Sequence, residues 1–242
     1  MNNTIKELFS RKSVRAYTDE PVPEQMKQLI LEAAAQAPTA GNQQLYTILD
    51  ITDQHLKDTL ADTCDHQPFI ASAPVVLIFC ADCQKWYDAF SHALCSPRTP
   101  GTGDLLLAAA DALIAAQNAV VAAESLGLGS CYIGDILERC ETHRELLSLP
   151  KYVVPAAMLV IGWPTEQQKG RTKPQRCSME HIVHTNGYRH MDEDELKAML
   201  GKNAGERGYQ EWIDAFCKRK YNSDFSREMS RSADKYLESF RK

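Results

Sequence analysis

Apolar residues along the chain recur at helical spacing in some segments and form short unbroken runs in others. From Pro23 to Ala37 they recur every three to four positions, which predicts an amphipathic helix that ends before Pro38. Proline is favoured in the first turn of a helix, so Pro23 fits the start of this one. A shorter helix is predicted at about Ile5 to Phe9, preceded by a capping-box spacing from Thr4 to Glu7.

Four short apolar runs predict β-strands, at residues 45–51, 74–81, 130–134 and 154–163. The second and fourth runs are apolar enough to be central strands of a sheet. A long helix at residues 104–126 and a shorter one at about 136–147 are predicted between the later strands. Helices that alternate with strands in this order, without an internal repeat, predict one α+β domain.

The most apolar segment, Leu105 to Ala123, approaches the length of a membrane span. It contains Asp111, Gln117 and Asn118, whose side chains would be costly in lipid. The segment is therefore predicted to be a helix buried on most sides, at the centre of the fold or in a subunit interface.

The chain changes character after Pro164. Residues 1–164 are predicted to form the core, and residues 165–242 a basic loop and a helical extension that complete the same domain and dimer. Three amphipathic helices are predicted between residues 192 and 241. The last one carries an apolar stripe that covers either its own subunit's core or a partner: Phe225, Met229, Ala233, Leu237 and Phe240.

Composition limits the possible partners. The chain has 242 residues, 44% of them apolar, and a net charge of −5. No general basic field attracts nucleic acid or an anionic membrane, so any anion site must be local. Eight cysteines without a framework spacing, and no basic segment leading into an apolar signal core, predict a reduced, cytoplasmic protein that is not secreted.

A local cluster of cations stands out against this acidic background. Arg11, Ser13 and Arg15 alternate in a segment predicted to be extended, so their side chains point to one side. Two guanidinium groups and a hydroxyl on one side suit a phosphate. A second basic set at residues 171–176 could close on the same anion, although either set alone is equally consistent with a solvated charged run.

Two further motifs lie between the basic sets. The residues APTAGNQQ (37–44) follow a helix end and offer amide donors and acceptors to a heterocycle or a polyol. The residues YIGD (132–135) follow a strand, and Gly134 would permit close backbone approach by a ligand. Asp135 and Glu138 are placed to cap the next helix, whose N–H groups would point at an electron-rich atom.

Five ordered motifs resemble the FMN-dependent nitroreductase superfamily, and nearest to them is its branch of NADPH-preferring flavin reductases and oxygen-insensitive nitroreductases. The motifs are RKSVRAYTDEPV, APTAGNQQ, AAQNAVVAAESLGLGSCYIG, VIGWP and KPQR followed by IVHTNGY. The resemblance implies a homodimer of α+β subunits, each with a central, mostly antiparallel sheet flanked by helices and a helical C-terminal extension. It also implies FMN bound at the subunit interface.

The resemblance further implies roles for individual residues. The phosphate end of FMN is assigned to Arg11, Lys12, Ser13, Arg15, Lys173 and Arg176. The ribityl chain or pyrimidine edge is assigned to Asn42, Gln43 and Gln44, and the isoalloxazine ring to Gln67. The backbone near flavin N5 is assigned to Tyr132, Ile133, Gly134 and Asp135. Lys202 and Arg207 are candidates for binding the nicotinamide nucleotide.

The implied activity is hydride transfer from NADPH or NADH through flavin N5 to a nitroaromatic, a quinone or free flavin, by a ping-pong mechanism. No side chain is assigned as an acid or a base. The alternative is a flavin-binding storage or sensor protein of the same fold. Two departures from the family pattern are Asp135, where a second glycine is common, and the extra residue between Pro174 and Arg176.

Three rival motifs point to other chemistry. Cys80 and Cys83 have the spacing of a redox or metal pair, but no second pair accompanies them, which favours an incidental role over a thiol oxidoreductase. The HIVH run at 181–184 lacks the glutamate of a zinc hydrolase, so no metal is predicted there. Gly127 and Gly129 follow a helix and precede a strand, the reverse of a dinucleotide fingerprint.

Overall fold

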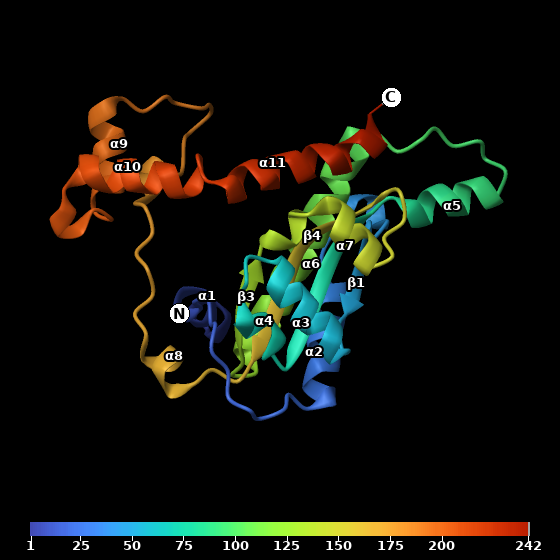
Figure 1. The fold of residues 1–242 in the computed structure, drawn as a ribbon, viewed down its shortest axis with the longest axis horizontal. Helices are drawn as coiled ribbons and strands as arrows, with labels where there is room; N and C mark the ends of the chain where they lie inside the picture. The colour runs from blue at the N-terminus through green and yellow to red at the C-terminus, as the bar shows by residue number, and fades with distance from the viewer. Residues whose placement is uncertain (242) are drawn as a thin grey trace. The chain divides into compact units, whose positions relative to one another are not determined.

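The computed structural model describes residues 1–241, which form two compact units. The first unit comprises residues 1–171 and the chain from residue 229 onward, and the second comprises residues 172–228. The first unit holds the sheet and its covering helices (Figure 1). The segment after Pro164 is thus shared between the two units.

A four-stranded sheet lies at the centre of the first unit. Its order is β1-β2-β4-β3, and every neighbouring pair is antiparallel. The strands are β1 (Tyr46–Asp50), β2 (Val75–Asp82), β3 (Gly129–Ile133) and β4 (Val153–Gly162). The predicted α+β class, the antiparallel sheet and the central places of the second and fourth strands are confirmed.

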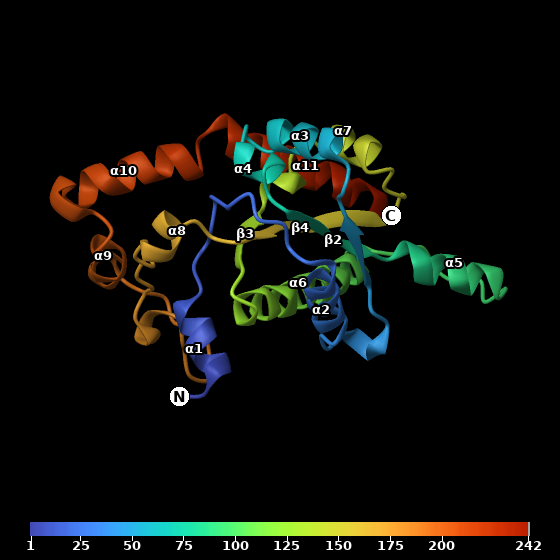
Figure 2. The same cartoon turned by 90° about the horizontal axis from the view of Figure 1, so that it is seen from below.

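Helices cover both faces of the sheet (Figure 2). One face packs against α2 (Glu24–Ala35) and α6 (Thr102–Ser125). The other packs against α3 (Gln54–Thr63) and the segment around α4 (Pro68–Ala71), with α7 (Cys140–Leu146) beside them. Two apolar layers therefore hold the strands from either side.

Further helices are divided between the two units. They are α1 (Asn3–Ser10), α5 (Gln84–His92), α8 (Glu166–Gly170), α9 (Glu193–Gly201), α10 (Tyr209–Lys220) and α11 (Asp224–Leu237). Short 3-10 turns are η1 (Ala40–Asn42), η2 (Asp135–Leu137), η3 (Met179–His181), η4 (Gly205–Arg207) and η5 (Glu238–Phe240). The three helices predicted after residue 192 are confirmed as α9, α10 and α11.

The polar residues within α6 serve the fold. By length and hydropathy, α6 is the one helix in the described chain that would suit a membrane span, yet it packs on the sheet and on α2. Asp111 is buried, and the Asn118 amide donates to the Ala33 carbonyl oxygen at 3.1 Å. The helix is buried on the side that packs on the sheet and α2, whereas Leu106, Leu107, Leu113 and Ile114 are exposed, so burial on most sides is not seen within this chain.

The apolar stripe of the last helix covers its own subunit. Of the predicted stripe, Phe240 is almost completely buried and Leu237 packs partly buried against the same cluster, which includes Cys83, Leu105 and Tyr152. Aromatic ring contact between Tyr152 and Phe240, with centroids 5.6 Å apart, strengthens this packing. The sequence leaves open whether the stripe covers its own subunit's core or a partner, and the C-terminal half of the stripe covers its own core.

Two predictions about helix capping are wrong. The cap of α1 is Asn2, whose side chain accepts from the Ile5 amide at 3.0 Å, so the helix starts ahead of the predicted capping box. The N-cap position of α7 is Arg139, with a left-handed φ of 48° and no side-chain cap, so neither Asp135 nor Glu138 occupies it. A 3-10 turn follows β3 directly and displaces the helix start.

Candidate functional site

The cationic segment, residues 11–15, runs as extended chain beside β3. The Val14 amide donates to the Ser130 carbonyl oxygen at 2.9 Å, and Ser13 forms a parallel bridge with Ser130. A Cβ atom on Gly129 would lie 2.5 Å from Val14 Cγ2, closer than real Cβ contacts allow. Gly129 therefore allows the cationic segment to approach the edge of the sheet. The comparison of Gly127 and Gly129 with a dinucleotide-binding fingerprint gives no indication of this role.

The two arginines of this segment make no ion pair within 4.0 Å among those found in residues 1–241, although Arg11 lies beside Glu124. The Nε atom of Arg11 is buried and has no hydrogen-bond partner within residues 1–241. Both guanidinium groups act on the buried Cys131 thiol, where burial raises the pKa and the positive charges of Arg15 and Arg11 oppose the rise. Arg11 and Arg15 thus converge on one residue of β3, as the alternation predicts.

Lys12 points to a different partner. Its ammonium group donates to the carbonyl oxygens of Lys169 at 2.5 Å and Arg171 at 2.6 Å. These carbonyls lie at the C-terminal end of α8, where a cation is favourable. The structure therefore uses Lys12 to fasten α8, and its predicted contact with the FMN phosphate does not follow from this geometry.

A buried carboxylate shapes the amide loop, residues 39–45. Asp111 of α6 accepts from the Ala40 amide at 3.0 Å and the Leu45 amide at 3.2 Å. Between these points Asn42 and Gln44 adopt left-handed backbone conformations, with φ of 56° and 51°. Such conformations persist when the surroundings enforce them, and Asp111 supplies that constraint.

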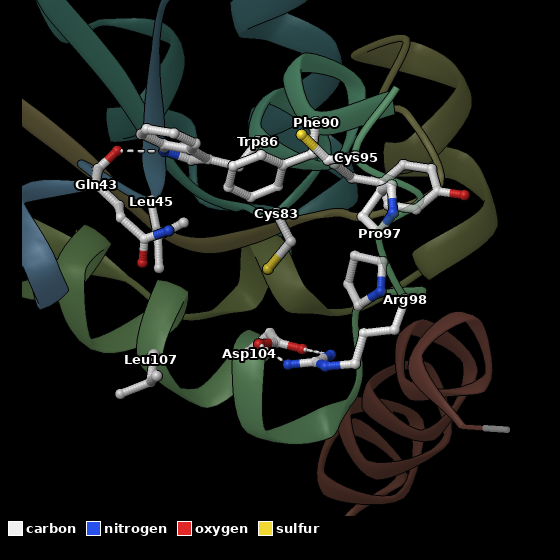
Figure 3. Close-up of a pocket in the computed structure, with 12 residues that line it drawn as sticks. Gln43, Leu45, Cys83, Trp86, Phe90, Cys95, Pro97, Arg98, Asp104 and Leu107 are labelled. Atoms are coloured by element: carbon white, nitrogen blue, oxygen red, sulfur yellow. Dashed lines mark hydrogen bonds and ion pairs between the residues drawn. The ribbon is translucent and has the colours of Figure 1, made fainter. Parts of the chain in front are cut away.

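A cleft of about 370 Å³ adjoins the amide loop (Figure 3). Gln43 lines one side, and its carbonyl oxygen accepts from Trp86 Nε1 at 2.7 Å. Trp86 and Phe90 of α5 contribute aromatic surface, and a bidentate pair of Arg98 with Asp104, at 2.6 and 2.9 Å, lines another part. The lining suits a planar apolar group more than an anion.

The residues assigned to the ring and to flavin N5 lie in the last two positions of β3, in the turn that follows, and between α3 and α4. Gln67 precedes α4, and its side-chain amide donates to the Cys64 carbonyl oxygen at 2.8 Å. Burial raises the pKa of Tyr132 to about 12. A Cβ atom on Gly134 would meet nothing within 4 Å, so nothing within this chain demands glycine there. That open space leaves room for a flat ligand face.

Within one chain the cationic segment and the amide loop are far apart. They flank opposite edge strands, β3 and β1, separated by three interstrand steps of about 4.8 Å each. Along α6, the loop is held at Asp111, whereas Arg11 lies beside Glu124, about 20 Å further at 1.5 Å per residue. The structure brings Arg11 close to Tyr132 and both arginines close to Cys131 of β3, but does not bring them together with Asn42, Gln43 and Gln44.

The later basic residues belong to the second unit. Arg176 and Lys202 line the same pocket of about 30 Å³, whereas Lys173 and Arg207 are not among its lining residues. Two cations therefore share a small space within this unit. The assignments of Lys173 and Arg176 to FMN, and of Lys202 and Arg207 to the nucleotide, stay predictions.

Cys80 and Cys83 are packed in the core, and the two histidines of the HIVH run each engage Nδ1, whereas Nε2 of His184 is buried without a partner in residues 1–241. Cys80 and Cys83 are buried, and burial raises the pKa of each thiol to about 12. His184 Nδ1 accepts from the Arg189 amide at 3.1 Å, and His181 Nδ1 lies 2.7 Å from the Ser178 hydroxyl oxygen. In the described part of the chain, no three His, Cys, Asp or Glu side chains are grouped as metal ligands would be.

We expect Cys83 to be inert in the native protein. With a pKa of about 12, only about one thiol in ten thousand is ionised at pH 8, and the thiolate is the reactive form. Iodoacetamide at pH 8 should therefore label the exposed Cys95 and Cys217 first, as read by mass spectrometry. Cys83→Ser should keep bound FMN, whereas Arg15→Ala should lose it; equal retention in both variants would contradict the site assignment.

Comparison with known proteins gives a consistent result. The Nitroreductase family matches residues 8–163. An FMN reductase [NAD(P)H] of Bacillus subtilis is 35% identical over 240 residues, covering 98% of this chain and 92% of the relative. An oxygen-insensitive NADPH nitroreductase of Salmonella typhimurium is 37% identical over 194 residues, covering 80% and 78%. Among solved structures, NADPH:FMN oxidoreductase from Vibrio harveyi, complexed with NAD+, superposes with a TM-score of 0.82 at 26% identity, covering 98% of each chain.

Proposed function

The chain belongs to the nitroreductase family, and from this premise we propose how its residues serve an FMN-dependent oxidoreductase that takes electrons from NAD(P)H. The similar proteins are named as reductases, which favours an enzyme over the storage or sensor alternative. The proposed acceptors are small aromatic molecules: nitroaromatics, quinones or free flavin. When bound, FMN accepts a hydride equivalent from the nucleotide and passes it to the acceptor.

The buried, unpartnered Nε of Arg11 is the observation that carries this proposal. A buried polar donor without a partner is costly, so its persistence fits a ligand that accepts from it. Arg15 and Ser13 extend the same side of the segment, giving an anion two guanidinium groups and a hydroxyl. Arg11, Ser13 and Arg15 would hold the FMN phosphate.

The chain's remaining contribution is orientation of the ring. The backbone of Tyr132 to Asp135 would border the isoalloxazine ring, and the open space beside Gly134 would admit its face. Gln67 would approach from the turn before α4. None of these side chains needs to act as an acid or a base, because the protein's share is to fix the ring and leave one face accessible.

A second copy of the chain would complete the site. The ribityl chain of FMN connects the phosphate to the ring, and both of these groups are proposed to bind beside β3. The ribityl chain would therefore also lie beside β3, whereas the amide loop lies beyond β1. We propose that the partner's amide loop reaches it across a homodimer interface. Exposed apolar side chains on α6 would be covered there: Leu106, Leu107, Leu113 and Ile114.

For the nucleotide, the second unit offers its cations. Lys202 shares a pocket with Arg176, and Arg207 follows within the same unit. A cluster of cations there would favour NADPH, whose extra phosphate NADH lacks. The preference for NADPH over NADH is part of this proposal, as is a cytoplasmic location.

Anaerobic spectroscopy tests the proposed function. Purified protein loaded with FMN should lose its visible flavin absorption when NADPH is added without oxygen, and a nitroaromatic or a quinone added afterwards should restore it. Free NADPH should be removed by gel filtration between the two additions, so that the steps are separated. Absorption that NADPH leaves unchanged would favour the storage or sensor alternative.

A further inference from the structure

A fully buried histidine joins the two segments that border the proposed ring position. His143 of α7 is 0% exposed. Its Nδ1 lies 2.9 Å from the Ile136 carbonyl oxygen, and its Nε2 lies 2.9 Å from the Thr63 hydroxyl oxygen. Ile136 belongs to the turn after Gly134, and Thr63 ends α3, just before the turn to Gln67.

The protons in this network can be placed from the chemistry of its atoms. The Ile136 carbonyl can only accept, so Nδ1 carries the hydrogen and donates it. The Thr63 hydroxyl has one hydrogen and two acceptors at 2.9 Å, Nε2 of the neutral ring and the Thr59 carbonyl oxygen. Burial lowers the pKa of His143, which keeps the ring in this neutral form.

Each end of the bridge leads directly to a residue proposed to border the flavin. On one side, Ile136 follows Gly134 and Asp135 within the same turn. On the other, Cys64 follows Thr63, and the Gln67 side chain donates to the Cys64 carbonyl oxygen at 2.8 Å. Both segments are otherwise on the surface: Gly134, Asp65 and His66 are exposed.

The turn that carries Gln67 has a backbone in need of support. Asp65 and His66 both adopt left-handed conformations, with φ of 60° and 50°. Two consecutive non-glycine residues in this region are costly unless the surroundings hold them. The contact between His143 Nε2 and the Thr63 hydroxyl anchors the residue at which this turn begins.

We propose that His143 is a positioning residue for the flavin site, fixing the Gly134–Asp135 backbone and the Gln67 side chain relative to each other. This inference rests on the proposed function. It assigns His143 no contact with FMN, because the imidazole is enclosed and both ring nitrogens are occupied within the chain.

Two substitutions cut the same bond from opposite sides. Thr63→Val is nearly isosteric and removes the hydroxyl. His143→Asn retains a donor close to the position of Nδ1 and loses Nε2. Both remove the contact between Nε2 and the Thr63 hydroxyl, and Thr63→Val also removes the bond from this hydroxyl to the Thr59 carbonyl oxygen at 2.9 Å. Because one contact is shared, the effects of the two substitutions should be less than additive in the double variant. Ser232→Ala is the matched control. Ser232 of α11 is also fully buried, and its hydroxyl oxygen accepts from the amide of Cys140 in α7, the helix that carries His143, at 2.9 Å.

The first readout needs no cofactor. In the apo-protein, hydrogen–deuterium exchange should rise about tenfold in residues 64–68 and 134–138 for Thr63→Val and His143→Asn, and stay at the wild-type rate there for Ser232→Ala. In the FMN-loaded protein, the same two variants should shift the visible spectrum of the bound flavin. They should also slow its anaerobic reduction at saturating NADPH about tenfold, while the FMN dissociation constant changes less than threefold.

Wild-type exchange, spectrum and reduction rate in Thr63→Val and His143→Asn would overturn the inference. Faster exchange over the whole chain would overturn it as well, because that outcome marks general destabilisation. If NADPH fails to bleach the wild-type flavin, the proposed function fails instead, and the exchange in the apo-protein still decides whether His143 couples the two segments.

Discussion

Replacing Arg11 with alanine is expected to weaken FMN binding by between about tenfold and one-hundredfold. A hydrogen bond to a charged group contributes roughly 1.5–3 kcal/mol, and each 1.4 kcal/mol corresponds to a factor of ten in affinity. The buried Nε of Arg11 has no other partner in the described chain, so the whole of this contribution is available to the phosphate. Isothermal titration of the apo-protein with FMN measures it.

Lys6→Ala is the matched control for Arg11→Ala, because Lys6 is an exposed cation on α1 in the same stretch of chain. It should bind FMN as the wild type does. Thermal denaturation of both apo-variants should accompany the titration, since Arg11 lies beside Glu124 and its removal leaves that partly buried carboxylate with less neighbouring positive charge. Equal FMN affinity in Arg11→Ala and Lys6→Ala would exclude Arg11 from the phosphate site.

Gly129→Ala is expected to destabilise the protein by about 1–3 kcal/mol and to weaken FMN binding with it, because overpacking forces the neighbouring backbone to move. The new methyl group would stand 2.5 Å from Val14 Cγ2 and 2.8 Å from Val14 Cβ. Relief of that clash requires the cationic segment to move away from β3, which displaces Ser13 and Arg15. Urea denaturation measures the stability, and FMN titration measures the displacement.

Two comparisons identify the cause of the Gly129→Ala effect. Gly103→Ala adds the same methyl group near the start of α6, where it would meet nothing within 4 Å, and should lower neither the stability nor the FMN affinity, because alanine is the better helix former. Adding Val14→Ala to Gly129→Ala removes the closest contact and should restore part of the stability. An unchanged free energy of unfolding in Gly129→Ala would contradict the close approach of the segment to the sheet.

The strands and the main helices could be predicted because their signal is local. The apolar run at residues 45–51 became β1 at Tyr46–Asp50, and the run at 154–163 became β4 at Val153–Gly162. The polar stretch that forms α3 has no comparable apolar pattern, and its start depends on Asp53, whose side chain accepts from the Leu56 amide at 2.7 Å. No helix was predicted there.

The parts of the site that escaped prediction depend on partners distant in the chain. Asp111 was noted only as a polar residue in an apolar helix, yet it holds the amide loop about 70 residues earlier in the chain. Lys12 was grouped with Arg11 and Arg15, although its carbonyl partners at Lys169 and Arg171 could not be read from the local pattern. The signal for Asp111 was present, because a buried acid needs hydrogen-bond donors.

The alternation of side chains in an extended chain separates Lys12 from Arg11, Ser13 and Arg15 within the cationic segment. Residues 11, 13 and 15 point to one side by this rule, and Lys12 to the other. The structure agrees, since Arg11 and Arg15 converge on Cys131 whereas Lys12 fastens α8. The family resemblance adds Lys12 to the phosphate site, and that assignment stays a prediction.

The most direct test of the phosphate assignment compares FMN with riboflavin, which lacks the phosphate. The wild type should bind FMN much more tightly than riboflavin, and the Arg11→Ala, Arg15→Ala double variant should bind the two with nearly equal affinity, its riboflavin affinity unchanged. If the double variant keeps the full preference for FMN, the phosphate is held elsewhere and the proposed site is wrong.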